Sequence, residues 1–172
     1  MTAFGLMALA LASAPACTAE HAQYQLRGAP GVTAGFAKQR FQINFASDLF
    51  FWVRTPDEGG RTWWFSMNAP NGYGGVSLSP DVDATKITEE DREAEPPTAP
   101  EQPIEFDFDT FDADYGYLDN PPQADTPAPA HLLARGLGPL LWYNPVGAAN
   151  GDKNAKAASI PIAMYDLAGC KP

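Results

Sequence analysis

The amino-acid sequence predicts a mainly β protein, a small single-domain antiparallel β-sandwich or partly open barrel with little helix. The 172-residue chain is 45% hydrophobic, enough for one modest core, yet it contains 17 prolines and 15 glycines. These residues interrupt long helices and favour short strands joined by turns. In addition, nine of the twenty Phe, Trp and Tyr residues lie between Arg40 and Asp81, in runs whose patterns are those of strands.

This aromatic-rich stretch predicts the central strands of the sheet. Apolar and polar residues alternate over 41–45, the period of a strand with one wet face. Residues 49–54 are apolar on both faces, which is typical of a strand in the middle of its layer. Asp57-Glu58-Gly59-Gly60 predicts the turn of a hairpin, which returns over 62–67. A further short strand is expected at 76–78.

The elements around this stretch are shorter. Two strands are predicted near the N-terminus, over 22–26 and 32–36, on either side of a Gly-Pro turn. Between 79 and 103 acids and prolines replace core-forming residues, which predicts a long acidic, Pro-rich exposed loop. Residues 104–109 alternate Ile or Phe with Glu or Asp, which predicts a strand. The alternation breaks immediately afterwards, so a bulge is expected near Thr110.

The C-terminal part of the chain predicts the last pair of strands. One helical turn is expected over 131–135, stopped by the glycines that follow it. Strands are then predicted over 140–143 and 159–167. Pro161 places the final strand at an edge of the sheet, because proline cannot donate a hydrogen bond to a neighbouring strand.

The first sixteen residues are typical of a secretory signal peptide. They carry no charged side chain and contain an apolar run from Phe4 to Ala12, followed by Ala14-Pro15-Ala16, a small-x-small cleavage site. The run is too short to cross a bilayer as a helix. Residues 17–172 are therefore predicted to form one mature domain, exported to the periplasm or to the outside of the cell. The alternative is an ordinary N-terminal helix buried in the fold.

The two cysteines bracket this predicted domain. Cys17 would be its first residue, and Cys170 lies two residues from the C-terminus. In an exported protein this arrangement favours one disulfide that ties the two ends together. The alternative is a lipoprotein anchored through Cys17, because Ala14-Pro15-Ala16-Cys17 resembles part of a lipobox. Lipidation would consume the Cys17 thiol and leave Cys170 unpaired.

Negative charge is concentrated in one segment. The net charge is −10, and residues 81–125 alone hold fifteen acidic and two basic side chains, so the remainder of the chain carries +3. A protein of this sign lacks the basic surface that nucleic acid requires and is repelled by anionic lipid. The expected partner is a cell-envelope protein or glycan, with membrane contact only through a lipidated Cys17.

A row of carboxylates is the most conspicuous polar feature. Glu105, Asp107 and Asp109 occupy alternate positions of a predicted strand, so their side chains share one face at spacings of about 6.5–7 Å. Carboxylate oxygens are the ligands that Ca²⁺ prefers, which suggests a weak calcium-binding face. The pattern lacks the acid and the glycine of a calcium-binding loop, since Phe111 stands where an acid is needed. The alternatives are a solvated strand face and a hydrolase that uses two of these carboxylates.

Several aromatic residues suggest either a core or a surface on which a sugar or peptide stacks. Trp64 and Tyr73 are the best candidates for exposure, because they flank polar and glycine-rich sequence. Together with Asn71 they form a predicted ligand-contact rim. The full set of aromatic candidates is Trp52, Trp63, Trp64, Tyr73, Trp142 and Tyr143.

No cofactor or catalytic residue is predicted, and no metal site other than the weak calcium-binding face. His21 and His131 are the only histidines, and neither has the spacing of a metal ligand, so each is interpreted as a lone surface histidine. No nucleophile-elbow motif is present. The sequence therefore favours a non-enzymatic exported module that acts by binding or assembly, with a secreted carboxylate hydrolase as the alternative.

Overall fold

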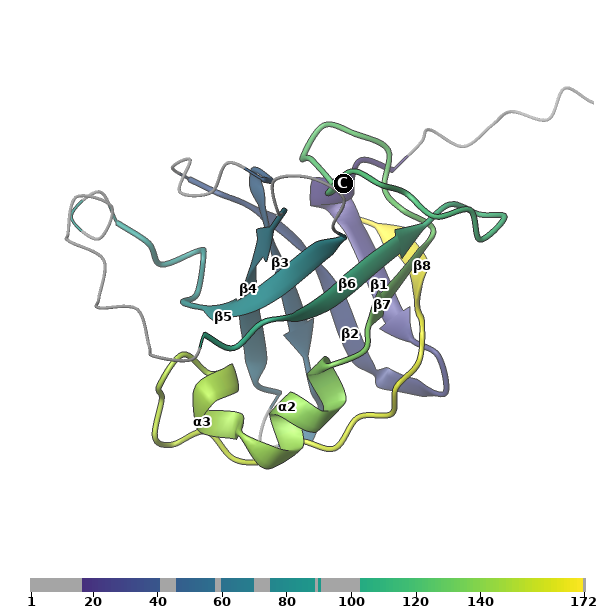
Figure 1. The fold of residues 1–172 in the computed structure, drawn as a ribbon. Coiled ribbons are helices and arrows are strands. Elements are labelled where there is room, and N and C mark those ends of the chain that lie inside the picture. Colours follow the sequence, from purple (N-terminus) through teal and green to yellow (C-terminus); the bar gives the residue numbers. More distant parts are fainter. Residues whose placement is uncertain are drawn as a thin grey trace, which may run out of the picture.

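The computed structural model describes residues 17–40, 46–57, 60–69, 75–88, 90 and 103–171. Eight antiparallel strands follow one another around a closed barrel, in which β8 pairs with β1 (Figure 1). This confirms the predicted mainly β, antiparallel fold with little helix. The sheet is a closed barrel, whereas the sequence predicted either a sandwich or a partly open barrel. The strands are β1 (Ala22–Leu26), β2 (Ala29–Lys38), β3 (Leu49–Arg54), β4 (Thr62–Asn68), β5 (Val76–Asp81), β6 (Phe106–Phe111), β7 (His131–Ala134) and β8 (Tyr165–Cys170). The helical elements are η1 (Ala19–His21), α2 (Leu137–Tyr143) and α3 (Pro145–Ala148).

Aromatic rings fill the interior of the barrel. The Phe51 ring lies at the centre of this cluster, with its centroid 4.9 Å from that of Phe108 and 5.8 Å from that of Phe36. Tyr165 packs against it edge-on at 6.2 Å, a geometry favoured by the charge distribution of aromatic rings. A barrel of eight strands is just wide enough for side chains to fill. Ligand sites are therefore expected at its ends or on its outer surface.

The predicted hairpin of β3 and β4 is present, and part of the predicted acidic loop covers its outer face. Phe50 points away from the barrel axis and is nevertheless buried, because Ala84 and Ile87 pack on it together with Trp64. Ala84 and Ile87 belong to the segment predicted to be exposed, so that prediction is wrong at these two positions. Most of the remaining loop, residues 91–102, lies outside the described residues.

Trp52, one of the aromatic candidates for core or surface, lies on the outer surface of the barrel, against a strand that carries a glycine. A Cβ atom at Gly35 would come within 2.6 Å of the Trp52 ring, so only glycine allows this close approach. The Trp52 indole N–H also donates to the Phe36 carbonyl at 3.2 Å. The ring therefore covers the outer face of β2.

The C-terminal part of the chain differs from the sequence prediction in each element. Residues 131–134 form strand β7 rather than a helical turn, because they pair with both β6 and β8 and complete the barrel. Residues 140–143 belong to α2 rather than to a strand, and the last strand begins at Tyr165, beyond Pro161. No bulge occurs at Thr110, whose pairing with Leu132 is in register with its neighbours.

The two ends of the barrel carry different structures. The disulfide end is formed by residues 46–48 before β3, the segment 112–130 between β6 and β7, Cys17 and the C-terminal end of β8. There Cys17 and Cys170 are joined, with their Cα atoms 5.9 Å apart, which confirms the predicted disulfide. The helical end carries the β3–β4 turn and the segment 135–164 with α2 and α3 (Figure 1).

Candidate binding groove

A wide hollow lies at the disulfide end, beside segment 112–130. Its volume is about 650 Å³, within the range of sites that hold small ligands. The segment that walls the groove arches over this end of the barrel, in green in Figure 1. The groove is lined by Ala46, Tyr117, Leu118, Asp119, Asn120, Pro121, Pro122, Gln123, Thr126, Pro127 and Pro129.

Gln123 fixes the two walls of the groove relative to each other. Its amide nitrogen donates to the Ala46 carbonyl at 2.9 Å, and its amide oxygen accepts the Asp48 backbone N–H at 3.1 Å. A second hydrogen bond joins the same two segments: the Asp48 carboxylate accepts the backbone N–H of Ala124 at 2.8 Å. Both sides of the groove are thus held by paired hydrogen bonds, and the Gln123 amide is already engaged.

The proline-rich wall is also fastened to the barrel and to the disulfide. The Tyr24 hydroxyl, from inside the barrel, donates to the Pro129 carbonyl at 2.9 Å. The backbone N–H of Ala128 donates to the carbonyl of Cys17 at 2.7 Å. These bonds, together with the restricted φ of proline, give the groove a fixed shape before any ligand arrives.

Tyr117 supplies the aromatic surface of the groove. The residue is 45% exposed, and its ring packs edge-on against Phe111 with centroids 5.9 Å apart. Burial, and after it the surrounding carboxylates, raise the pKa of the Tyr117 phenol, so it stays protonated at neutral pH. The carboxylates are those of Asp109, Asp119 and Asp107.

A second polar cluster lies on the outer surface beside the groove segment. Arg27 binds both carboxylate oxygens of Asp166, at 2.9 and 2.7 Å, and donates to the Tyr115 hydroxyl at 3.0 Å. His131 contacts the same carboxylate through Nδ1 at 2.7 Å, and its ring stacks on that of Tyr115 at 4.3 Å. The Arg27 guanidinium, followed by His131, holds the pKa of Asp166 below its ordinary value.

This cluster corrects the prediction that His131 is a lone surface histidine. The side chain is 16% exposed and is held by a hydrogen bond with Asp166 and by the Tyr115 ring. Tyr115 has a left-handed backbone, with φ of 62°, which is uncommon for a residue other than glycine. The contacts with His131 and Arg27 hold this turn against β7 and β8, so the cluster positions the start of the groove segment.

The predicted carboxylate row lies on β6 and just before it. Asp107 is highly exposed, and Arg135 of the following segment contacts both Asp107 and Asp109, at 3.4 and 3.2 Å. The Ser77 hydroxyl donates to Glu105. A guanidinium between two carboxylates opposes a further cation there by its like charge. Among the described residues, no group of three or more His, Cys, Asp or Glu side chains is placed to hold a metal ion.

The predicted ligand-contact rim is only partly described. Trp64 is half-buried and packs against the cluster around Phe50, so it acts mainly as a structural cover. Asn71 and Tyr73 lie outside the described residues.

The other aromatic candidates divide between core and surface. Trp63 is buried inside the barrel, whereas Trp142 and Tyr143 of α2 are 52% and 83% exposed. Because Trp142 and Tyr143 belong to α2, they lie at the helical end of the molecule, away from the groove.

Sequence reasoning missed the residues of the groove. Neither Tyr117 nor residues 121–129 were among the predicted site residues. The available signal was a tyrosine followed by Asp119-Asn120-Pro121-Pro122, a rigid polar turn beside an aromatic ring. Its meaning depends on Ala46, which lies about seventy residues earlier in the chain and forms the opposite wall.

Comparison of the chain with protein-family models, with curated proteins and with solved structures gave no match in any of the three. Within the described part of the chain, none of the helices has the length and apolar character needed to cross a membrane.

Proposed function

We propose that the protein is an exported, non-enzymatic binding module that holds a neutral oligosaccharide of the cell envelope in the groove at its disulfide end. The observation that carries this proposal is the groove itself, with a volume of about 650 Å³. It combines an aromatic ring that is 45% exposed with polar side chains and a wall of prolines.

The chemistry of the lining suits a sugar. The face of a tyrosine ring can stack on the C–H groups of a pyranose, while its hydroxyl remains available for a hydrogen bond. Asp119 provides acceptors and Asn120 provides both donors and acceptors, which match sugar hydroxyls. The carboxylates around Tyr117 disfavour an anionic ligand, so a neutral glycan is the better fit.

Rigidity supports a binding role as well. The hydrogen bonds of Gln123 and Asp48 fix the groove in advance, so little conformational entropy is lost when a ligand binds. The surrounding barrel is packed with rings and provides a stiff frame.

Export is supported by the disulfide. Such bonds form and persist in oxidising compartments, and the Cys17 sulfur is part of one. The same sulfur would have to form a thioether in a lipoprotein, so the disulfide favours a soluble exported protein over a lipid-anchored one. The signal-peptide prediction for residues 1–16 falls outside the described residues.

Titration calorimetry with a small set of neutral trisaccharides tests the proposal. We suggest the N-acetylglucosamine trimer, cellotriose and maltotriose, with an oligogalacturonate of the same length as the acidic comparison. At least one neutral trisaccharide is expected to bind, and the acidic one is expected to bind more weakly.

Replacing Tyr117 provides the decisive variant. Tyr117→Ala removes the aromatic surface of the groove and should weaken binding roughly tenfold, which corresponds to about 1.4 kcal/mol. Tyr143→Ala is the matched control, because Tyr143 is exposed on α2 at the opposite end. Equal losses in the two variants, or no binding of any neutral trisaccharide, would sink the proposal.

A further inference from the structure

The outer face of α2 exposes two adjacent aromatic side chains. Trp142 is 52% exposed and Tyr143 is 83% exposed. Leu137 and Leu141 of the same helix are buried, and residues four apart share one face of a helix. One face of α2 therefore packs on the protein, whereas the other presents both rings to the outside.

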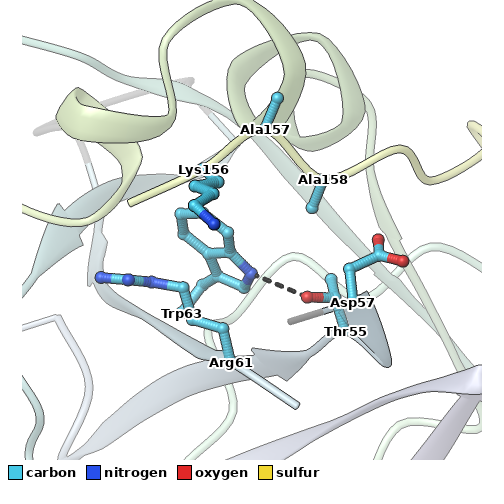
Figure 2. Close-up of a pocket in the computed structure, with 7 residues that line it drawn as sticks. All are labelled: Thr55, Asp57, Arg61, Trp63, Lys156, Ala157 and Ala158. Atoms are coloured by element: carbon cyan, nitrogen blue, oxygen red, sulfur yellow. Dashed lines mark hydrogen bonds between the residues drawn. The ribbon is translucent and has the colours of Figure 1, made fainter. Parts of the chain in front are cut away.

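The inner side of this end is already filled. A Cβ atom at Gly138 would come within 2.9 Å of the Ile160 carbonyl oxygen, so the segment that follows α3 lies directly against α2. The backbone N–H of Ala158 donates to the Leu141 carbonyl at 3.2 Å. The small pocket between this segment and the β3–β4 turn has a volume of about 60 Å³ (Figure 2), far below the roughly 300–1,000 Å³ of ligand sites. A partner of the helical end therefore has to contact its outer surface.

Two further apolar side chains are exposed at this end. Val146 of α3 is 37% exposed, and Ile162, in the segment that follows Ile160, is 64% exposed. Figure 1 shows α2 and α3 together at the end of the barrel opposite the C-terminus. We refer to Trp142, Tyr143, Val146 and Ile162 as the apolar tip.

The chain that forms the apolar tip is nearly free of charge. Residues 136–151 contain no charged side chain, and neither do residues 157–165. Of the charged side chains between them, Asp152 is paired with Arg61 at 2.6 Å. Contact through the apolar tip therefore requires little desolvation of charge. The net charge of −10 repels an anionic partner, so a surface without net charge is the better fit.

The two rings suit a boundary between water and lipid. Trp142 and Tyr143 each combine an apolar body with one polar group, and within the described part of the chain neither forms a hydrogen bond or a ring contact. Side chains of this kind are enriched where a membrane meets water, because the ring enters the apolar layer while its N–H or O–H group stays near the headgroups.

A second copy of the chain is the other occupant to consider. A fully buried aromatic side chain removes about 150–250 Å² from water, so these two rings offer roughly 200–350 Å². A stable protein interface buries about 800 Å² on each partner. The apolar tip is small by this measure, whereas a bilayer accommodates a few inserted side chains.

We propose that the apolar tip inserts into the surface of a bilayer of zwitterionic phospholipid, such as phosphatidylcholine. The sequence predicted membrane contact only through a lipidated Cys17, but this contact needs no attached lipid. It also holds the disulfide end and its groove away from the bilayer. A single myristoyl chain binds with a constant of about 10⁴ M⁻¹, and the tip inserts less apolar surface, so half of the protein should be bound at on the order of 1 mM lipid.

Vesicle sedimentation combined with tryptophan fluorescence tests the proposal on the full chain. Phosphatidylcholine vesicles should carry the protein into the pellet, and the Trp142 emission should shift to shorter wavelength because the ring leaves water. Lipids brominated in their acyl chains should quench this emission. Trp142→Phe should lose the spectral shift but keep its binding within about threefold, since phenylalanine is still an apolar ring. Absence of binding to these vesicles would overturn the proposal.

A pair of variants locates the contact. Trp142→Ser combined with Tyr143→Ser should weaken vesicle binding about tenfold or more, which is a loss of about 1.4 kcal/mol or more. Leu167→Ser is the matched control, because Leu167 is an apolar residue of β8 that is 36% exposed on the barrel wall, and it should leave binding unchanged. Equal binding by the double variant and the unaltered protein would contradict the assignment.

Anionic lipid and lipid-free protein separate insertion from its alternatives. Replacing about a third of the lipid with phosphatidylglycerol should weaken binding at about 10 mM salt and have little effect at about 0.5 M salt, because salt screens the repulsion from the negative protein. Tighter binding to the anionic vesicles at low salt would mean an electrostatic contact instead. A dimer in lipid-free sedimentation that the double variant abolishes would assign the tip to a second copy. Either result would overturn the proposal.

Discussion

At the helical end the barrel is covered by apolar side chains, whereas at the disulfide end it is closed by hydrogen bonds and one covalent bond. Leu137 and Leu141 of α2 and Ala148 of α3 are buried against the barrel. At the other end, Gln123 and Asp48 join two distant segments, and Cys17 is bonded to Cys170. The first closure depends on burial of apolar surface and the second on specific partners, so they should respond to different perturbations.

This difference matches the sites at the two ends. The disulfide end combines a wide groove with walls that are fixed by polar contacts, an arrangement suited to a ligand with many hydroxyl groups. The helical end leaves only a small hollow of about 60 Å³ between packed elements.

Loss of the disulfide should have the largest effect. The double variant Cys17→Ser with Cys170→Ser should lower the free energy of unfolding by about 2–5 kcal/mol, because the bond closes a loop of 153 residues. Urea denaturation measures this change, and a reductant should not alter the variant further. Amide hydrogen exchange should accelerate more in the groove segment than in α2. Equal acceleration at both ends would contradict the proposed division.

Truncation of the apolar closure should have the next largest effect. Leu141→Ala should cost about 2–5 kcal/mol, because Leu141 is fully buried between α2 and the barrel. Tyr143→Ala, on the exposed side of the same helix, should change stability by less than about 0.5 kcal/mol. The measurement is again urea denaturation. If the two variants were equally stable, the helical end would not be held by apolar burial.

The smallest effect is expected for the ion pair outside the barrel. Asp166→Asn should cost less than about 1 kcal/mol at pH 7, because Arg27 and Asp166 are partly exposed and screened by solvent. The pKa of Asp166 is lowered in the folded state, so its contribution is complete above the unfolded pKa of about 3.9 and is lost as the pH falls through the folded value. Thermal unfolding between pH 7 and pH 2.5 should show the two proteins converge in stability. A constant difference across that range would exclude this ion pair as its cause.

Local patterns determined much of the β-sheet. The alternation of β4, the two-sided apolar character of β3 and the turn between them are properties of short segments, and a period of two residues is visible without any tertiary context. The disulfide was also predictable, because the chain contains only two cysteines and one pairing between them. A strand was predicted over 104–109, and β6 overlaps this range but runs over Phe106–Phe111. Asp109 is ion-paired rather than free in solvent.

Tertiary contacts decided the remaining elements and the sites. Residues 131–134 form a strand because their backbone pairs with both β6 and β8, and this pairing cannot be recognised from the short segment alone. Ile87 is buried because Phe50 lies beneath it, although its own neighbours in sequence are polar. The groove and the small pocket each join residues far apart in the chain, Ala46 with Tyr117 and Arg61 with Lys156. The sequence by itself determined which segments alternate and which atoms can form a disulfide, because those properties are local. The closed barrel decided which side chains face one another. Its closure brings together residues that are far apart in the chain, and no local sequence pattern indicates that they will meet.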